Sequence, residues 1–118
     1  EQKLLDPNAY EDGMMFVCTK QTYNECMELR LLGLPYEYLA MVQSLKPEKS
    51  ALFLFNMTDR RLHGIFEAAT KGEEHIDDTA WSRNKKKQWS SPFPAQIRFR
   101  IVQQFSALPD AEIRHIFK

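Results

Sequence analysis

A stretch from Ser50 to Ala69 restricts the folds that this chain can adopt. Its first half, Ala51–Met57, is apolar on both parities of a strand, which is typical of a strand inside a sheet that is covered on both faces. Its second half, Leu62–Ala69, is a shorter apolar run that contains Gly64, and the polar residues 58–61 separate the two runs. The stretch therefore predicts a β-hairpin with a four-residue loop, which we take as the central pair of strands.

A strand and a helix are expected ahead of this hairpin. Met14–Cys18 is a short apolar run of the kind found in buried strands. A helix is predicted over Tyr23–Leu32, because Thr22 and Glu25 form a capping-box pattern in which each side chain accepts from a free backbone N–H of the first turn. Gly33 follows where a left-handed cap residue is favoured, so we expect the helix to end there.

A second helix, another strand and a final helix complete the prediction. Pro35 suits the first position of a helix, and Pro47 ends the helical spacing of apolar residues. Alternation over Gln96–Gln103 predicts a strand with one apolar face and with Gln96 on the opposite, solvated or ligand-facing side. A short helix is expected over residues 109–117. This order of elements, with a long loop after the hairpin, is typical of an α+β domain.

Composition excludes several classes of protein. The 118-residue chain has the size of one domain, which we place at residues 13–118 behind a flexible arm of residues 1–12. Its 16 basic and 16 acidic residues cancel, so any site for a polyanion must be local. No apolar run reaches the roughly 20 residues of a membrane helix. The two cysteines are expected to be free thiols in an intracellular compartment, either cytoplasm or nucleus.

The segment from Thr70 to Pro94 carries the strongest functional signal. It has little periodicity, and a connection of this length is usually functional or mobile. Two tryptophans flank a basic run in it, a combination that suits stacking of an unpaired base and contact with phosphates. Alternatively, the first tryptophan is a core residue and the basic run is simply solvated. The candidate ligand-binding residues are Trp81, Trp89, Arg83 and Lys85, extended by Arg98 and Arg100 if their strand lies beneath the loop.

The hairpin and the second helix supply further candidates. Gly64 leaves room over the sheet and Glu67 is an acid in an apolar stretch, so this strand is the expected floor of a pocket between the hairpin and the long loop. Tyr36 and Tyr38 lie beside the rigid Leu34–Pro35 corner, where aromatic side chains suit protein recognition. They would equally suit half-buried positions on a helix.

The sequence contains no pattern of catalytic or metal-binding residues. Cys18 and Cys26 lie in apolar segments, whereas a reactive thiol needs exposed, electropositive surroundings. The histidines lack the spacing of zinc ligands, and the acids of residues 73–78 lack the pattern of a calcium loop. We therefore expect neither enzymatic activity nor a metal or cofactor.

Several separated motifs point to one family. Leu-Gly-Leu-Pro, Leu-Phe-Leu-Phe and Pro-Ala-Gln-Ile occur in this order, with further matches in Gly-Met-Met-Phe-Val-Cys, in the second hairpin strand and in Asp-Thr-Ala-Trp. They resemble the plant development and cell death (DCD) domain, whose motifs are Phe-Gly-Leu-Pro, Leu-Phe-Leu-Phe and Pro-Ala-Gln-Val; its late Pro-Leu-x-Glu motif is not reproduced. The resemblance covers nearly the whole chain and implies a non-enzymatic module of plant proteins that respond to hormones, stress and cell-death signals. The matching segments are Gly13–Cys18, Leu32–Pro35, Leu52–Phe55, Leu62–Ala69, Asp78–Trp81 and Pro94–Ile97.

A second similarity concerns architecture. A first strand that leads into a helix, followed by a Leu-Phe-x-Phe strand paired with a Gly-containing strand, is similar to YTH and other PUA-like domains, which bind modified bases of RNA. It implies a small, twisted mixed sheet or incomplete barrel flanked by helices. We expect a non-catalytic recognition module of a stress, development or cell-death regulator, with RNA as its ligand through a modified or unpaired base. The alternative is a protein-interaction or self-association module that does not bind nucleic acid.

Overall fold

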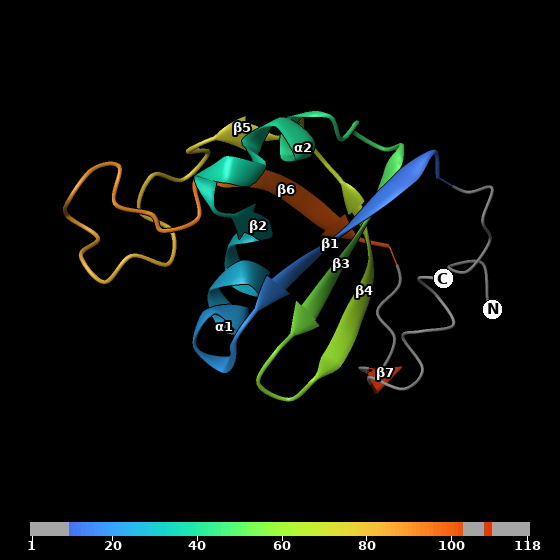
Figure 1. Cartoon of the computed structure of the whole chain (residues 1–118), viewed down its shortest axis with the longest axis horizontal. Coiled ribbons are helices and arrows are strands. Elements are labelled where there is room, and N and C mark those ends of the chain that lie inside the picture. Colours follow the sequence, from blue (N-terminus) through green and yellow to red (C-terminus); the bar gives the residue numbers. More distant parts are fainter. Residues whose placement is uncertain (1–9, 103–107, 110–118) are drawn as a thin grey trace.

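The predicted hairpin lies at the centre of the sheet (Figure 1). The computed structural model describes residues 10–102 and 108–109 of the chain. Strand β3 (Ser50–Asn56) pairs antiparallel with β4 (Arg61–Ala68) and parallel with β1 (Asp12–Cys18). Six of the seven residues of β3 are buried, so both of its faces are covered, as its apolar pattern predicts.

The other strands turn this sheet into a nearly closed barrel. Strand β6 (Ala95–Ile101) pairs with β4 on one side and with β2 (Leu31–Leu34) on the other, so the order is β1-β3-β4-β6-β2. Two short strands, β5 (Glu73–Glu74) and β7 (Leu108–Pro109), pair with β6 and β4.

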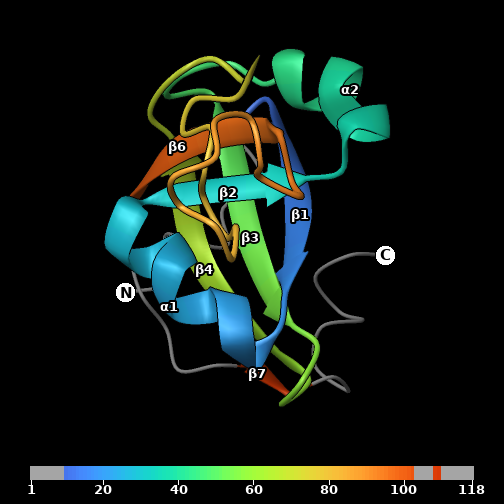
Figure 2. The ribbon, with the colours of Figure 1, turned by 90° about the vertical axis from the view of Figure 1, so that its left-hand side faces the viewer.

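The barrel is open at one place. Strand β2 crosses in front of β4 and β3 and ends beside β1 (Figure 2), yet β1 and β2 form no ladder in the part of the chain that the structure describes. We call this opening the seam. The mixed sheet with its helices confirms the predicted α+β class and incomplete barrel.

Strand β1 differs from the buried strand that the sequence predicts. Phe16 and Cys18 point into the core, whereas Met15 and Val17 are exposed. The reason is the position of β1 at the edge of the sheet, where only one of its faces is covered by the described residues. An apolar run identifies the strand but does not show that one face is open.

The first helix also differs from its prediction. Helix α1 spans Lys20–Leu29, and its capping box consists of Thr19 and Thr22, with Thr22 Oγ1 accepting from the Thr19 N–H at 3.0 Å. Arg30, with a φ of 51°, ends the helix, so the predicted cap at Gly33 is wrong. The residues after Arg30 form β2, because antiparallel pairing with β6 buries Leu31, Leu32 and Leu34. Tertiary pairing thus overrides a helical pattern.

The second helix forms where it is predicted. A 3-10 turn, η2 (Tyr36–Tyr38), leads into α2 (Leu39–Gln43), which buries Val42. The predicted last helix begins at Pro109, which lies in β7, and its remaining residues are outside the described part of the chain. No helix in residues 10–102 is long and apolar enough to cross a membrane.

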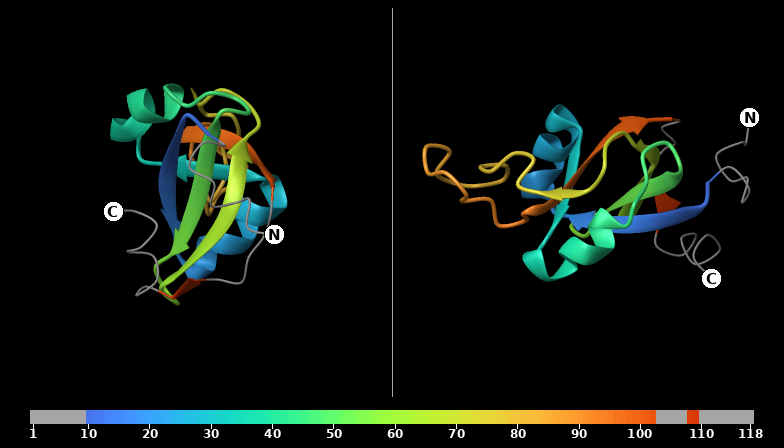
Figure 3. Two further views of the ribbon diagram at one scale, coloured as in Figure 1. Left: turned by 90° about the vertical axis from the view of Figure 1, so that its right-hand side faces the viewer. Right: turned by 90° about the horizontal axis from the view of Figure 1, so that it is seen from above.

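The predicted arm and the long loop contact the sheet in different ways. Of the predicted arm, residues 1–9 are outside the described range, while Tyr10 donates to Glu67 and the Glu11 N–H donates to the Lys49 carbonyl. The long loop, residues 70–94, contains β5, which pairs with β6, and its later, orange part extends away from the barrel, as the view from above shows (Figure 3).

Gly33 lies where the long loop meets the sheet. A Cβ atom on this residue would stand 2.7 Å from Cζ3 of Trp81 and 2.8 Å from the carbonyl oxygen of Phe93. Both distances are shorter than a Cβ contact allows, and one of the two neighbours is backbone. The glycine therefore permits close packing of the loop on β2.

We expect Gly33→Ala to lower the free energy of unfolding by about 1–3 kcal/mol, because the added methyl group overpacks this contact. Urea denaturation measures the change. Gly13→Ala is the comparison variant: its nearest backbone neighbour, the Ala51 carbonyl oxygen, would be 3.2 Å away, so the loss should be smaller. Wild-type stability in Gly33→Ala would show that the contact relaxes freely.

Candidate functional site

Gln96 attaches the base of the long loop to β6. Its side chain is fully buried. Its Oε1 accepts from the Asp77 N–H at 2.7 Å, and its Nε2 donates to the carbonyl oxygens of Asp77 at 3.0 Å and Phe93 at 3.1 Å. The predicted solvated or ligand-facing side of β6 is therefore covered at Gln96, since the loop folds over this residue and satisfies its amide.

Trp81 occupies the core position that the sequence left open as an alternative. Its indole is 9% exposed, touches Gly33, and meets the Phe93 ring edge-on with 5.7 Å between the centroids. Its backbone has a φ of 62°, and its N–H donates to Glu25 Oε2 at 2.8 Å. This position leaves almost no indole surface on which a base could stack.

Trp89, by contrast, is 60% exposed. One part of its ring lies against His75, with 4.9 Å between the centroids, and the remainder faces solvent. The residues between the two tryptophans include the exposed cations Arg83, Lys86 and Lys87, which form no ion pair with another described residue. The loop thus presents one exposed indole surface together with three cations that are unpaired among the described residues.

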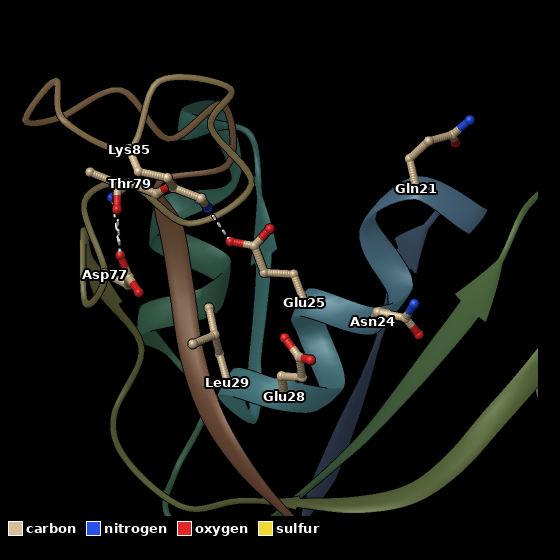
Figure 4. Close-up of a pocket in the computed structure, with 8 residues that line it drawn as sticks. All are labelled: Gln21, Asn24, Glu25, Glu28, Leu29, Asp77, Thr79 and Lys85. Carbon is tan, nitrogen blue, oxygen red and sulfur yellow. Dashed lines mark hydrogen bonds and ion pairs between the residues drawn. The ribbon is translucent and has the colours of Figure 1, made fainter.

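Lys85 is held differently from its basic neighbours. It reaches toward α1, where its ammonium group forms an ion pair with Glu25 and donates to the Thr79 carbonyl oxygen at 3.0 Å (Figure 4). These residues line a polar cavity of about 490 Å³ between α1 and the loop. The Lys85 ammonium group is therefore paired with a carboxylate of the same domain.

The remaining charged candidates form hydrogen bonds or ion pairs with other groups of the domain. Arg98 Nη1 donates to the Leu29 carbonyl oxygen at 2.5 Å, at the end of α1. Arg100 Nη2 lies 3.1 Å from Glu67 and 3.5 Å from Glu48. Glu67 also accepts from the Tyr10 hydroxyl. All of these groups therefore have partners inside the domain, and the structure does not bring them together with Trp89.

The space expected over Gly64 is filled. A Cβ on this residue would stand 2.9 Å from Cδ1 of Phe53, because that ring packs against the glycine. The predicted pocket floor at Gly64 and Glu67 thus lies beneath other side chains. A smaller apolar cavity of about 250 Å³ is found at the seam, where Met57 of the hairpin turn and Phe93 of the long loop both contribute to its wall.

Tyr36 and Tyr38, the predicted candidates for protein recognition, belong to a larger exposed apolar surface. Tyr36 is 62% exposed, and Tyr38 lines a groove of about 590 Å³ between α2 and β1. The groove borders the seam cavity, because both include Val17, Leu34 and Pro35. The sequence indicated the part of the groove at Tyr38 and the Leu34–Pro35 corner, whereas the wall that β1 supplies depends on the edge position of that strand, which no local signal shows. The exposed apolar side chains around it are Met15, Val17, Tyr36, Tyr38, Met41 and Met57.

The cysteines are unsuited to nucleophilic chemistry. Burial raises the pKa of the Cys18 thiol to about 12 and that of the Cys26 thiol to about 11. Both are therefore protonated at neutral pH. Burial also lowers the pKa of His63, which keeps its imidazole neutral. Among the described residues, no three His, Cys, Asp or Glu side chains are grouped so that they could hold a metal ion.

Comparison with known proteins agrees with the motifs and the fold. A family model described as "Development and cell death domain" matches residues 12–118. The chain belongs to this family. This DCD domain is 44% identical over 112 residues to B2 protein of Daucus carota, covering 95% of this chain and 53% of that protein. It is 44% identical over 104 residues to DCD domain-containing protein NRP-B of Glycine max, covering 88% of this chain and 31% of that protein. The DCD domain thus spans about half of the former relative and less of the latter.

Solved structures share the fold of this DCD domain. A complex of the YTH domain-containing protein mmi1 with RNA superimposes with a TM-score of 0.60 and 12% identity, covering 95% of this chain and 69% of that chain. The Mmi1 YTH domain alone gives a TM-score of 0.59 at 12% identity, with 92% and 62% covered. These likenesses confirm the predicted architectural similarity to YTH domains, at identities that show the fold alone. The predicted resemblance to the DCD family is confirmed by the family model and the plant relatives.

We expect Trp81→Ala to lower the free energy of unfolding by about 3–5 kcal/mol, since it removes a buried indole and leaves a cavity beside Gly33. Chemical denaturation measures this loss. Trp89→Ala is the matched control: its indole is exposed, so we expect a change within about 0.5 kcal/mol. Equal effects of the two substitutions would contradict the assignment of Trp81 to the core.

Proposed function

We propose that this DCD domain is a non-catalytic recognition module that binds single-stranded RNA through the exposed part of its long loop. The observation that carries the proposal is the exposed part of the Trp89 indole, in the same loop segment as Arg83, Lys86 and Lys87, which have no ion-pair partner among the described residues. An exposed ring gives a base a stacking surface, and nearby cations attract the phosphates, whatever the net charge of the chain. The fold that is shared with a YTH domain solved with RNA supports the proposal.

The proposed contacts divide among the candidate residues. Trp89 stacks on a base, while Arg83 and the two exposed lysines contact phosphates. Lys85, Arg98, Arg100 and Glu67 hold the domain together through the ion pairs and hydrogen bonds described above. We place a flipped, unpaired base in the seam cavity, whose largely apolar wall suits a base face and whose lining includes the polar residues Thr19 and Thr22.

The proposed setting of this activity follows from the family. DCD proteins are linked by name to development and cell death. We infer that the protein carrying this domain is a regulator of stress, development or cell-death responses that uses the domain to recognise its target. Two buried free cysteines fit a reducing intracellular compartment, cytoplasm or nucleus.

Fluorescence anisotropy with a labelled single-stranded RNA of mixed sequence tests the proposal. We expect binding that weakens with salt, and an increase in Kd of about five- to 150-fold for Trp89→Ala, since base stacking contributes about 1–3 kcal/mol. Gln88→Ala, the exposed uncharged neighbour, should bind like the wild type. No binding at low salt, or binding that is indifferent both to salt and to Trp89→Ala, would refute the proposal.

A second candidate function is protein recognition in the groove between α2 and β1. Large exposed apolar side chains gather there, more than scattered surface residues would explain. The outer edge of β1 is unpaired in residues 10–102, and Met15 and Val17 lie two residues apart on one exposed face. The occupant that fits is an extended segment of a partner protein, which pairs with the β1 backbone and places every second, apolar side chain in the groove.

Selection of random displayed peptides on the immobilised domain tests this candidate. We expect enriched peptides to carry apolar residues at every second position and to lose binding in Val17→Lys, because a charge then stands in the apolar groove. Asn24→Lys places the same charge on the exposed side of α1 and should not affect binding. Enriched peptides without this alternation, or peptides that bind Val17→Lys normally, would exclude strand addition at β1.

A further inference from the structure

Glu25 connects helix α1 to the exposed part of the long loop (Figure 4). Its Oε2 accepts from the Trp81 N–H at 2.8 Å and forms the ion pair with Lys85. The Lys85 ammonium group donates to the Thr79 carbonyl oxygen as well, at 3.0 Å. One carboxylate on a helix thus holds the loop at two points of its chain.

The rest of this loop segment is held from within. Ser90 Oγ donates to Ser82 Oγ at 2.7 Å and to the Asn84 carbonyl oxygen at 3.2 Å. Gln96 fixes the base of the loop but reaches only Asp77, Ser91 and Phe93. Within the described ranges, Glu25 is therefore the charged side chain outside the loop that is hydrogen-bonded to residues 81–89.

We propose that Glu25 is a positioning residue for RNA binding. By holding Trp81 and Lys85, it fixes the segment that carries the exposed cations and Trp89, and it withdraws the Lys85 charge from contact with phosphate. This inference rests on the proposed RNA binding. Its physical basis is preorganisation: a segment that is already ordered loses less conformational freedom when it binds.

A positioning role and the negative charge of Glu25 predict opposite changes in RNA affinity when this residue is removed. Glu25 is an acid next to a basic surface, and such an acid repels a polyanion, so its removal should strengthen RNA binding if charge were its only effect. A positioning role predicts the opposite sign, because the loop loses its attachment to α1. The direction of the change in affinity therefore separates the two explanations.

The first test compares two alanine variants by RNA anisotropy. In Glu25→Ala we expect Kd to rise about three- to tenfold as the loop loses both contacts. Glu28→Ala is the matched control: it removes the same charge from the same helix and the same cavity wall, but Glu28 has no hydrogen bond or ion pair with the described loop residues. We expect it to bind equally or more tightly. Binding by Glu25→Ala as tight as wild type would overturn the inference.

The second test asks whether Lys85 touches phosphate. A lysine that contacts single-stranded RNA contributes about 0.7 to the slope of log K against log salt concentration. We expect Lys86→Met to lower this slope by about that amount, and Lys85→Met to raise Kd while leaving the slope unchanged. A fall in slope for Lys85→Met equal to that for Lys86→Met would show that Lys85 contacts phosphate and would overturn the positioning role.

A third readout does not depend on RNA. Amide hydrogen exchange over residues 81–89 should be faster in Glu25→Ala than in wild type and unchanged in Glu28→Ala, because the Trp81 N–H and the loop lose their partner on α1. If the wild-type domain binds no RNA, the proposed function fails, whereas faster exchange would still support the attachment of the loop by Glu25. Unchanged exchange in Glu25→Ala would refute that attachment.

Discussion

The burial of β3 on both faces is the constraint on which the rest of this domain depends. A strand covered on both sides needs neighbours in the sheet and side chains above and below it, and β1, β4 and the core side chains supply them. Because β1 is then the last strand on its side, one of its faces remains open and the groove beside α2 forms there. The burial of β3 thus determines that the exposed apolar surface lies on the open face of β1.

The long loop is a folded part of the domain. Burial of a polar side chain is costly unless its hydrogen bonds are made, and the Gln96 amide finds its partners in the backbone of the loop. Trp81 adds apolar contacts between the loop and β2, because its indole fills the space over Gly33. Between these contacts the chain is free to face solvent, so the same loop contributes both to the core and to the surface proposed for ligands.

The sequence predicted the parts of the fold that one segment determines alone. The hairpin follows from an apolar run on both parities, and the long loop follows from the lack of periodicity. The end of α1 could not be predicted, because Leu31 and Leu32 continue a helical spacing and only pairing with β6 makes them a strand. The two tryptophans of the candidate site could not be told apart from the sequence, because both have polar neighbours along the chain. Trp81 is buried because Gly33, which is distant in the sequence, has no side chain and leaves room for the indole.

Left-handed backbone at Trp81 and at Trp89 marks the two ends of the basic segment of the long loop. Their φ angles of 62° and 60° turn the chain at both ends of the basic segment, so that residues 82–88 form an excursion with fixed ends. Insertions or deletions within it would change its length and charge without moving the indole that packs on Gly33. The length and charge of this segment can therefore change while the core contact of Trp81 is kept.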